Sequence, residues 1–248
     1  KRAPRVMRPS PATAVSESMS SSAAAVASVR DVSKTFGSRK ALNGVSVEVA
    51  AGEMVALIGP SGSGKSTLLR SITGLQSIDP GKGTIEVFGE VVQKNGHVTG
   101  RVRAARGKLG MIFQQFNLVP YLSTQANVTL PCGLSELRKK RTEPTVADEA
   151  ERLLAALSIP EDHWQRKVTR LSIGQQQRIA AARALIGAPG LILADEPTSA
   201  LDADNRDRFL ELLLNLAHRH NTSVLFVSHD QSLARHFGNQ LELRGDRT

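Results

Sequence analysis

A glycine-rich run at residues 59–67, GPSGSGKST, carries the clearest chemistry in the sequence. Glycines let the backbone curl so that successive N–H groups point at phosphate oxygens, beside the positive end of a helix. Lys65 is then placed to reach the β- and γ-phosphates of a nucleotide, and the Ser66 hydroxyl to ligate Mg²⁺. The run predicts a phosphate-binding loop for a nucleoside triphosphate, made of Gly59, Pro60, Ser61, Gly62, Ser63, Gly64, Lys65, Ser66 and Thr67.

Two adjacent carboxylates follow an apolar run much later in the chain. Asp195 and Glu196 close the segment 191–196, LILADE. Because ligands sit at the carboxyl ends of parallel strands, we expect Asp195 to emerge beside the phosphate loop and to hold Mg²⁺ through water. Glu196 is placed to polarise an attacking water, a role worth roughly 10²–10⁴ in rate. Alone, the pair is equally consistent with an acidic turn before Pro197; the phosphate loop favours the catalytic interpretation.

Apolar runs and amphipathic stretches alternate along the chain and supply the framework for these residues. Continuous apolar or β-branched runs predict strands at residues 25–36, 41–50, 53–59, 84–92, 191–195 and 223–228. Apolar spacing of the helical kind predicts helices at residues 145–157, 172–186 and 203–220. Strands that alternate with helices predict an α/β fold. Residues 93–108, with five Lys/Arg and no acid, are expected to be a solvated loop or subdomain edge.

The two halves of the predicted site are far apart in the chain, since Asp195 lies 131 residues after Gly64. Residues 115–170 have a helical pattern and are expected to form an inserted helical subdomain. Residues 1–28 are rich in Ser, Ala, Pro and Arg and are expected to be a disordered extension. A transit peptide is the alternative interpretation of this start. An upstream extension is preferred, because Met19 offers a shorter start.

Composition excludes several classes of protein. The 248 residues, 40% hydrophobic, suffice for one domain with a subdomain and not for a tandem pair. No apolar run approaches the roughly 18 residues of a membrane helix, and the single Cys132 excludes an internal disulfide. The net charge is +9, but residues 1–30 carry five basic residues and one acidic residue, so the remainder is only mildly basic. The few aromatic residues form no stripe with the basic ones, so we expect no nucleic-acid partner.

Further motifs surround these two sites in a fixed order. They are Phe36, Gln114 after MIF, LSIGQ at 171–175, SALD at 199–202, and His229 after SVLFVS. Together with the phosphate loop and the carboxylates, this pattern resembles the nucleotide-binding subunits of ABC transporters over residues 29–245. The resemblance implies an ABC ATPase domain at 29–248 with a P-loop NTPase core, mainly a parallel sheet with flanking helices. It also implies an antiparallel β subdomain and an inserted α-helical subdomain.

The resemblance assigns a role to each motif. Phe36 would stack on the adenine of ATP, and Mg²⁺ would be organised by Ser66, Gln114 and Asp195. The catalytic residues would be Glu196, His229, Gln114 and Lys65. A second subunit, identical or similar, would form a head-to-tail dimer in which its ATP site is completed in trans by Ser172, Gly174, Gln175 and Asp202. The dimer would dock on an integral-membrane permease, peripherally, at the cytoplasmic face of the plasma (inner) membrane.

Ile173 departs from the family pattern, because it replaces the first glycine of the usual LSGGQ. A β-branched residue strongly disfavours positive φ, so we expect ordinary backbone geometry here. The N–H of Ile173 remains available, and Gly174 still permits close approach of a phosphate. We therefore expect retained ATP binding.

The segment after Gln114 bears on the kind of transporter. The ending NVTLP at 127–131 resembles ATPases of macrolide-efflux and lipoprotein-release systems, and Ile173 is similar to what some of these show. The export type is therefore favoured. Residues 116–120, FNLVP, are similar to phosphonate and amino-acid importers, which are the alternative. A soluble, non-transport ABC ATPase is less favoured, because such proteins carry two cassettes or a long coiled coil.

Several other polar or aromatic residues are expected to be structural. His163, Trp164 and Phe209 are predicted to be packing residues, and Cys132 to be a buried apolar residue. The basic run RKKR at 138–141 is expected to be a solvated loop, with contact to anionic lipid as an alternative.

Overall fold

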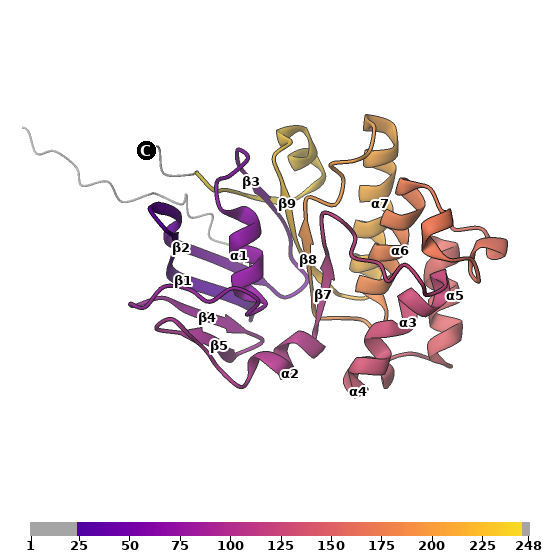
Figure 1. The fold of residues 1–248 in the computed structure, drawn as a ribbon, viewed down its shortest axis with the longest axis horizontal. Helices are drawn as coiled ribbons and strands as arrows, with labels where there is room; N and C mark the ends of the chain where they lie inside the picture. The colour runs from indigo at the N-terminus through magenta and orange to yellow at the C-terminus, as the bar shows by residue number, and fades with distance from the viewer. Residues whose placement is uncertain (1–23, 245–248) are drawn as a thin grey trace, which may run out of the picture.

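The computed structural model describes residues 24–244, which form two five-stranded sheets and a set of helices (Figure 1). The antiparallel sheet contains β1 (Ala25–Phe36), β2 (Arg39–Ala50), β4 (Thr84–Val87), β5 (Glu90–Lys94) and β6 (His97–Val98) in the order β2-β1-β4-β5-β6. The parallel sheet contains β3 (Met54–Ile58), β7 (Leu109–Ile112), β8 (Leu191–Asp195), β9 (Ser223–Ser228) and β10 (Asn239–Glu242) in the order β10-β3-β9-β8-β7. The predicted α/β fold class is confirmed.

The parallel sheet positions the predicted site. Strands β8 and β9 are buried along their whole length, as expected for apolar runs covered on both faces. Ile58 of β3 pairs with Ser228 of β9, and Asp195 of β8 pairs with Val227. The carboxyl ends of the three strands therefore meet at one edge of the sheet. The residues that follow them are brought together there.

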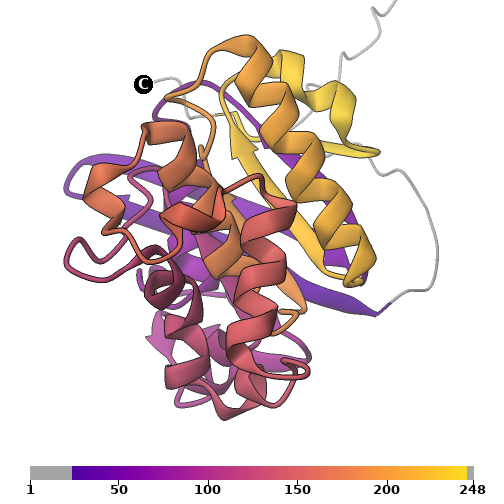
Figure 2. The ribbon, with the colours of Figure 1, turned by 90° about the vertical axis from the view of Figure 1, so that its right-hand side faces the viewer.

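The helices form two groups. The structure contains α1 (Lys65–Ile72), α2 (Val102–Gly107), α3 (Thr124–Leu134), α4 (Glu136–Lys139), α5 (Val146–Ala156), α6 (Ile173–Leu185), α7 (Ala203–Arg219) and the 3-10 turns η1 (Glu161–His163), η2 (Val168–Arg170) and η3 (Gln231–His236). Helices α3 and α5 pack on α6 at one end of the molecule, and α7 packs on β9 (Figure 2). One hydrophobic core joins Leu153 of α5, Ile179 of α6 and Phe226 of β9. Helices α5, α6 and α7 confirm the three predicted helices.

The segment 84–92 is two strands, so the prediction of a single strand is wrong. The chain turns at Phe88 and Gly89, whose φ angles are 52° and 75°, and β4 pairs antiparallel with β5. Positive φ at both central residues suits a tight hairpin turn. The sequence did not reveal this turn, because an apolar phenylalanine occupies its first position. For residues 93–108 the alternative of a solvated loop is wrong, because they contain the end of β5, all of β6 and α2. The alternative of an edge agrees with the structure, since β6 is the last strand of the antiparallel sheet.

Strand β1 begins before the predicted end of the N-terminal extension at residue 28. Val26 and Ala27 are buried, and Ala27 pairs with Val49 on one side and Val87 on the other. These small apolar residues belong to the antiparallel ladder, so the boundary is corrected to before Ala25. The rest of that prediction falls on residues 1–23, outside the described residues. None of the helices in residues 24–244 has the length and apolar character that a membrane-spanning helix requires.

In the basic run at 138–141, Lys139, Lys140 and Arg141 are exposed, but the prediction of a solvated loop is wrong for Arg138. Arg138 lies on α4, is 5% exposed, and donates hydrogen bonds to the backbone carbonyls of Leu109, Ala184 and Ile186. Burial lowers the pKa of its guanidinium to about 10. Arg138 thus satisfies carbonyls that the end of α6 leaves without helical partners. Burial of Cys132 and Phe209 is confirmed.

Candidate active site

The phosphate-binding loop joins the end of β3 to the start of α1, as predicted. Gly62 and Gly64 have φ angles of 78° and 97°, which favour glycine. A Cβ at Gly64 would lie 2.1 Å from the Ala41 carbonyl oxygen, and one at Gly59 would lie 2.3 Å from that of Leu243. The loop is therefore held so tightly against β2 and the end of β10 that its glycines cannot carry side chains. A buried oxygen, Ser63 Oγ, has no hydrogen-bond partner among the described residues.

Lys65 lies at the centre of the site. Its side chain is buried, and Nζ donates to the carbonyl oxygens of Gly59 and Pro60, each at 2.8 Å. Nζ also lies 3.7 Å from Glu196 Oε1. Burial lowers the pKa of Lys65, and the neighbouring Glu196 carboxylate opposes that shift. The ammonium group is thus held between the loop and the acidic end of β8.

Ser66 and Asp195 meet across the site, although they are far apart in sequence. Ser66 Oγ donates to Asp195 Oδ1 at 2.7 Å. Asp195 is 3% exposed; burial raises the pKa of its carboxyl group, and the hydrogen bond from Ser66 acts in the opposite direction. A hydroxyl and a carboxylate are hard oxygen donors of the kind that Mg²⁺ prefers. The residues present therefore fit this ion.

Glu196, the second carboxylate of the site, contacts His229. Glu196 has a φ of 46°, an uncommon value for a residue with a side chain, and its N–H donates to the Val227 carbonyl at 3.1 Å. Its Oε2 lies 3.1 Å from His229 Nδ1. Backbone strain at such positions persists only where the surroundings enforce it, and it recurs at functional sites. The carboxylate is thereby held between Lys65 and His229.

Gln114 and Phe36 border this group. Ile112 of β7 pairs with Ala194, so Gln114, exposed two residues beyond the strand, follows the same sheet edge as Asp195. Phe36 is 47% exposed at the end of β1, with Lys34 Nζ 5.4 Å from its ring centroid. Among residues 24–244, no hydrogen bond joins the Gln114 side chain to the phosphate loop.

Two contacts were missed by sequence reasoning. Arg39, which pairs with Phe36 across the turn, donates from Nη2 to the Gly62 carbonyl at 2.6 Å. His163 has a polar contact that its assignment as a packing residue did not predict, because its Nδ1 lies 3.0 Å from Gln175 Nε2. The contact of Arg39 could have been suspected from the sequence only weakly, because Arg39 lies in the turn that follows Phe36. His163 and Gln175 are joined by tertiary structure alone, so no local pattern could reveal their contact.

The residues predicted to act in trans lie at the starts of α6 and α7. Ser172 and Gln175 form a capping box, in which the side chain of each bonds the backbone N–H of the other. Asp202 caps α7 by accepting from Asn205 N at 3.0 Å. Among the described residues, no hydrogen bond connects these residues to the phosphate loop. The structure therefore does not bring the two predicted groups together within one chain.

The tip of α6 is exposed and open. Ile173, the first residue of the helix, has the ordinary backbone geometry that we expected, and it is 56% exposed. A Cβ at Gly174 would meet its nearest atom, Leu201 Cδ2, at 3.7 Å, an ordinary contact. Packing within the chain therefore does not require glycine at this position, in contrast to Gly59 and Gly64.

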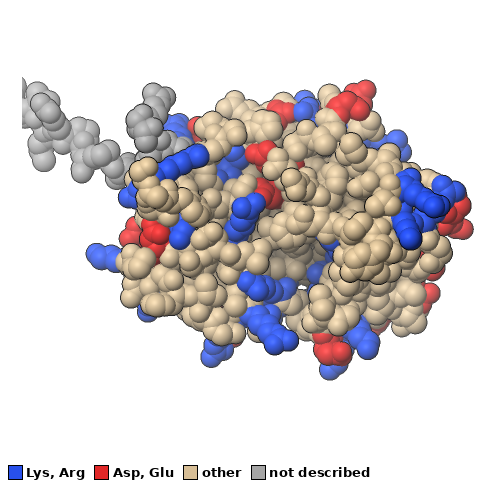
Figure 3. All heavy atoms as spheres, in the orientation of Figure 1, with Lys and Arg blue, Asp and Glu red and all other residues tan. Residues whose placement is uncertain are grey.

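A groove of about 850 Å³ lies between α2 on one side and α3 and α4 on the other. Its walls include apolar Leu134, which is 83% exposed, and Leu137. Its basic lining residues are Arg103, Arg106, Lys108, Arg138 and Arg183, and none of the described lining residues is acidic. In Figure 3, Lys and Arg side chains border a hollow beside the position of α2.

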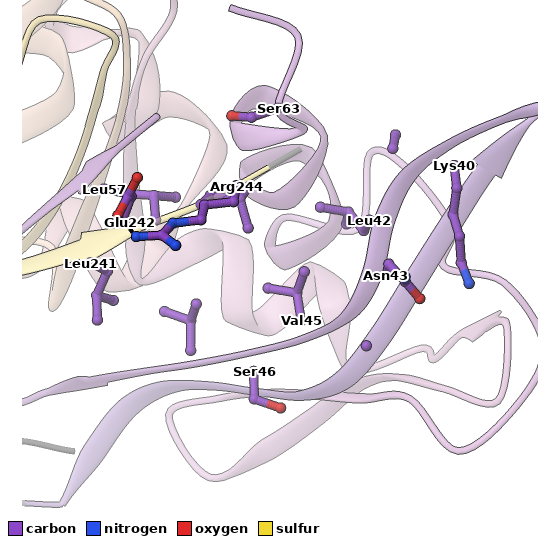
Figure 4. Close-up of a pocket in the computed structure, with 14 residues that line it drawn as sticks. Lys40, Leu42, Asn43, Val45, Ser46, Leu57, Ser63, Leu241, Glu242 and Arg244 are labelled. Carbon is purple, nitrogen blue, oxygen red and sulfur yellow. Dashed lines mark hydrogen bonds and ion pairs between the residues drawn. The ribbon is translucent and has the colours of Figure 1, made fainter. Parts of the chain in front are cut away.

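A separate cavity of about 280 Å³ lies between β2 and β10 (Figure 4). Half of its described lining residues have aliphatic side chains, among them Leu42, Val45 and Leu241. Of the described lining residues, only Ser63 belongs to the phosphate loop. Lys65 and Asp195 do not line it, so this cavity is distinct from the site around them.

Comparisons with known proteins agree with this geometry. The family model described as "ABC transporter" matches residues 42–199. The phosphonates import ATP-binding protein PhnC of Caulobacter vibrioides is 47% identical over 217 residues, 84% of this chain and 80% of that protein. The PhnC of Paraburkholderia xenovorans is 40% identical over 84% of this chain and 71% of its own length.

Solved structures give the same result. The dimeric structure of MJ0796, a bacterial ABC transporter cassette, has a TM-score of 0.75 and 33% identity, covering 89% of this chain and 97% of that one. The same cassette in a dimeric post-hydrolysis state bound to ADP and Pi has a TM-score of 0.73 and 32% identity over the same shares of the two chains. The named relatives are import ATPases, which favours the importer alternative over the export type that we preferred. The chain belongs to the ABC transporter family, as an ATP-binding and ATP-hydrolysing cassette with the P-loop NTPase fold.

Proposed function

We propose that this chain energises an importer of the phosphonate type, as a head-to-tail dimer docked on an integral-membrane permease at the cytoplasmic face of the inner membrane. The observation that carries the catalytic part is the set of contacts joining Lys65, Glu196 and His229 beside the Ser66–Asp195 pair. The direction of transport is supported by the relatives that are named as phosphonate import proteins.

ATP would be held by the loop from Gly59 to Thr67, whose N–H groups and helix end favour phosphate. Phe36 would stack on the adenine from the end of β1. Mg²⁺ would be held by Ser66 and Asp195, with Gln114 beside them, and would neutralise charge on the β- and γ-phosphates. Lys65 would exchange its contacts with the loop carbonyls for the phosphate oxygens, since both are acceptors within its reach.

Hydrolysis requires a base and a group that steadies the γ-phosphate. Glu196 would accept a proton from the attacking water, because its carboxylate is fixed at the sheet edge by its backbone conformation. His229 would orient Glu196 and contact the γ-phosphate. Because phosphoryl transfer depends on positioning and charge stabilisation, these fixed contacts are the chain's main contribution to rate.

The second half of the site would come from another copy or a similar ATPase. Ser172, Gly174 and Gln175 lie at an exposed helix start, and Asp202 lies at another. The N–H groups of Ile173 and Gly174 are at the positive end of a 13-residue helix and suit a phosphate. The absence of any internal need for glycine at Gly174 supports close approach by a partner's nucleotide.

The groove beside α2 supports the permease partner. Exposed Leu134 offers an apolar anchor, and the exposed guanidinium groups of Arg103 and Arg106 complement carboxylates. We propose that a permease segment with apolar and acidic side chains docks there. This contact would hold the chain peripherally at the membrane.

The named relatives favour the importer over the export type, and one residue behind the export preference has a structural role. That preference depended partly on the pattern Asn127…Pro131. Asn127 is fully buried, accepts from Val119 N at 2.7 Å and donates to the carbonyls of Val119 and Ser123. The asparagine thus holds the start of α3 through hydrogen bonds within this chain.

Replacing Glu196 tests the catalytic part. In Glu196→Gln we expect ATP binding and an ATP-dependent dimer to persist while steady-state phosphate release falls at least about 100-fold. Glu211→Gln, at an exposed position of α7, is the control and should hydrolyse ATP normally. Turnover of Glu196→Gln within a few-fold of the unchanged chain would remove Glu196 from this role.

Reconstitution tests the direction. The chain is copurified with its permease from detergent-solubilised membranes and placed in proteoliposomes. ATP-dependent movement of a labelled phosphonate in the import direction is the expected result. ATP hydrolysis that is unaffected by phosphonates and moves none of them would contradict the importer while leaving the ATPase intact.

A further inference from the structure

The carboxamide of Gln175 is held on both sides. Its Oε1 accepts from the Ser172 N–H at 3.0 Å, and its Nε2 faces His163 Nδ1 at 3.0 Å. Gln175 N in turn donates to Ser172 Oγ at 3.3 Å. The side chain that would face a partner's nucleotide is therefore clamped between the start of α6 and the end of η1.

The hydrogen-bond pattern fixes the state of the imidazole. A backbone N–H can only donate, so the group of Gln175 that meets Ser172 must be the oxygen. The amide NH₂ is then directed at His163 Nδ1 and can only donate. Nδ1 must consequently be an acceptor, which requires a neutral imidazole with its proton on Nε2. A protonated ring would present a second donor to the NH₂ group and break the contact.

Few charged or polar groups lie around the His163 imidazole. His163 is partly buried, and its Nε2 lies 3.7 Å from Asp162 Oδ2. Asp162 is also paired with Arg166, one turn along. From α6, the nearby charged residue Arg178 is directed to the Ser158 carbonyl, at 3.4 Å. Gln175 is thus the polar group of α6 that meets the imidazole.

We propose that His163 is a positioning residue of the site completed in trans: the neutral imidazole holds Gln175 in place, and protonation releases it. This rests on the proposed function, in which Gln175 acts at a partner's nucleotide. When the imidazole gains a proton, the capping box loses the outer support of its glutamine. The start of α6 then no longer presents one fixed shape to the γ-phosphate. Acidic pH therefore weakens dimer closure through this residue.

Two substitutions separate positioning from simple packing. Asn can place its Oδ1 where Nδ1 of His lies, so His163→Asn keeps an acceptor that does not titrate. His163→Leu keeps bulk and removes the acceptor. The readout is kcat and KM for ATP of the permease-bound complex between pH 5.5 and 8.5, with the ATP-dependent dimer measured in parallel.

At pH 8 we expect His163→Asn to match the unchanged chain and His163→Leu to lose about 3- to 10-fold in kcat/KM. As the pH falls, the ratio of His163→Asn activity to that of the unchanged chain should rise, because only the latter loses the contact. His229 is present in every variant, so its contribution cancels from the ratio. His218→Asn, at an exposed position of α7, is the control and should give a flat ratio.

The outcomes are distinguishable. If Ser172→Ala and Gln175→Ala both leave turnover and dimerisation unchanged, the proposed site in trans fails. If those two variants are impaired but His163→Leu behaves like the unchanged chain, only the role of His163 fails. A flat ratio for His163→Asn, or equal loss in both His163 variants, also overturns the inference, since packing alone would then explain the residue.

Discussion

At the scale of single residues, the site is a set of charges held out of water by contacts from several elements. Asp195 at the end of β8 is buried against Ser66 of α1, and Lys65 is buried against the loop carbonyls. Burial disfavours the charged form of both groups, as the direction of each pKa shift indicates. Such an arrangement costs stability in the free protein, and the proposed Mg²⁺ and triphosphate would offset that cost.

The Asp195 carboxyl gives a test of this cost. Asp195→Asn keeps an oxygen that can accept from Ser66 and removes the buried charge. Because the folded-state pKa of Asp195 is raised, its stabilising contribution is present at low pH and is lost as the pH rises through that pKa. We expect Asp195→Asn to unfold about 2–4 °C higher than the unchanged chain at pH 7, and to match it at acidic pH.

Thermal unfolding without Mg²⁺ between pH 4 and 8 measures the difference. In the same variant, ATP hydrolysis should be lost, since the carboxylate proposed to bind Mg²⁺ has been replaced by an uncharged amide. Asp204→Asn, at an exposed position of α7, controls for net charge. Equal melting temperatures at pH 7 would show that the buried carboxylate carries no cost.

The sequence predicted most residues of this site because their motifs are local. The loop from Gly59 to Thr67 and the Asp195–Glu196 pair each follow an apolar run, so their positions at a sheet edge follow from the strands. Arg39, Arg138 and His163 were missed or misassigned. Each bonds to a residue of a distant segment, and a basic or imidazole side chain does not itself reveal whether it will be exposed. Only the packed tertiary structure decides that.

At the scale of elements, α6 is fixed at both ends by side chains. Ser172 and Gln175 satisfy its first N–H groups, and Arg138 of α4 satisfies carbonyls at its last turn. The helix thereby connects the exposed tip proposed to meet a partner's nucleotide to the groove proposed for the permease, since Arg138 and Arg183 both line that groove. Rigidity of α6 gives these two surfaces a fixed relation.

Removing Arg138, which bonds the carbonyls at the C-terminal end of α6, should lower the free energy of unfolding. Arg138→Met keeps most of the volume but leaves the carbonyls of Leu109, Ala184 and Ile186 without this donor. We expect the free energy of unfolding to fall by about 2–4 kcal/mol, because buried acceptors lose their partners. Denaturation by urea measures it. Arg141→Met, which removes one exposed bond to the Ala188 carbonyl, should cost less than about 1 kcal/mol, and an equal loss in both would contradict the structural role of Arg138.

At the scale of the whole molecule, the two groups of site residues lie on separate elements and are not bonded to each other within the described chain. The loop, Asp195 and Glu196 gather at the edge of the parallel sheet, while Ser172 and Asp202 begin α6 and α7 at an open surface. The proposed assembly with a second cassette would unite them, and the two solved relatives named above are dimeric. The groove beside α2 is a third surface, which we propose for the permease.

Because the groove is separate from the phosphate loop, we expect changes in the groove to weaken binding to the permease without affecting ATP binding. Arg103→Glu reverses a charge and Leu134→Asp removes an exposed apolar anchor, and neither residue contacts the phosphate loop. We expect each variant to bind ATP normally but to copurify with the permease at least about 10-fold less, because a desolvated mismatch costs more than 1.4 kcal/mol. Leu75→Asp, at another exposed leucine outside the groove, should copurify normally. If Leu75→Asp were as impaired as the groove variants, or if the groove variants assembled fully, the permease would have to bind elsewhere on the chain.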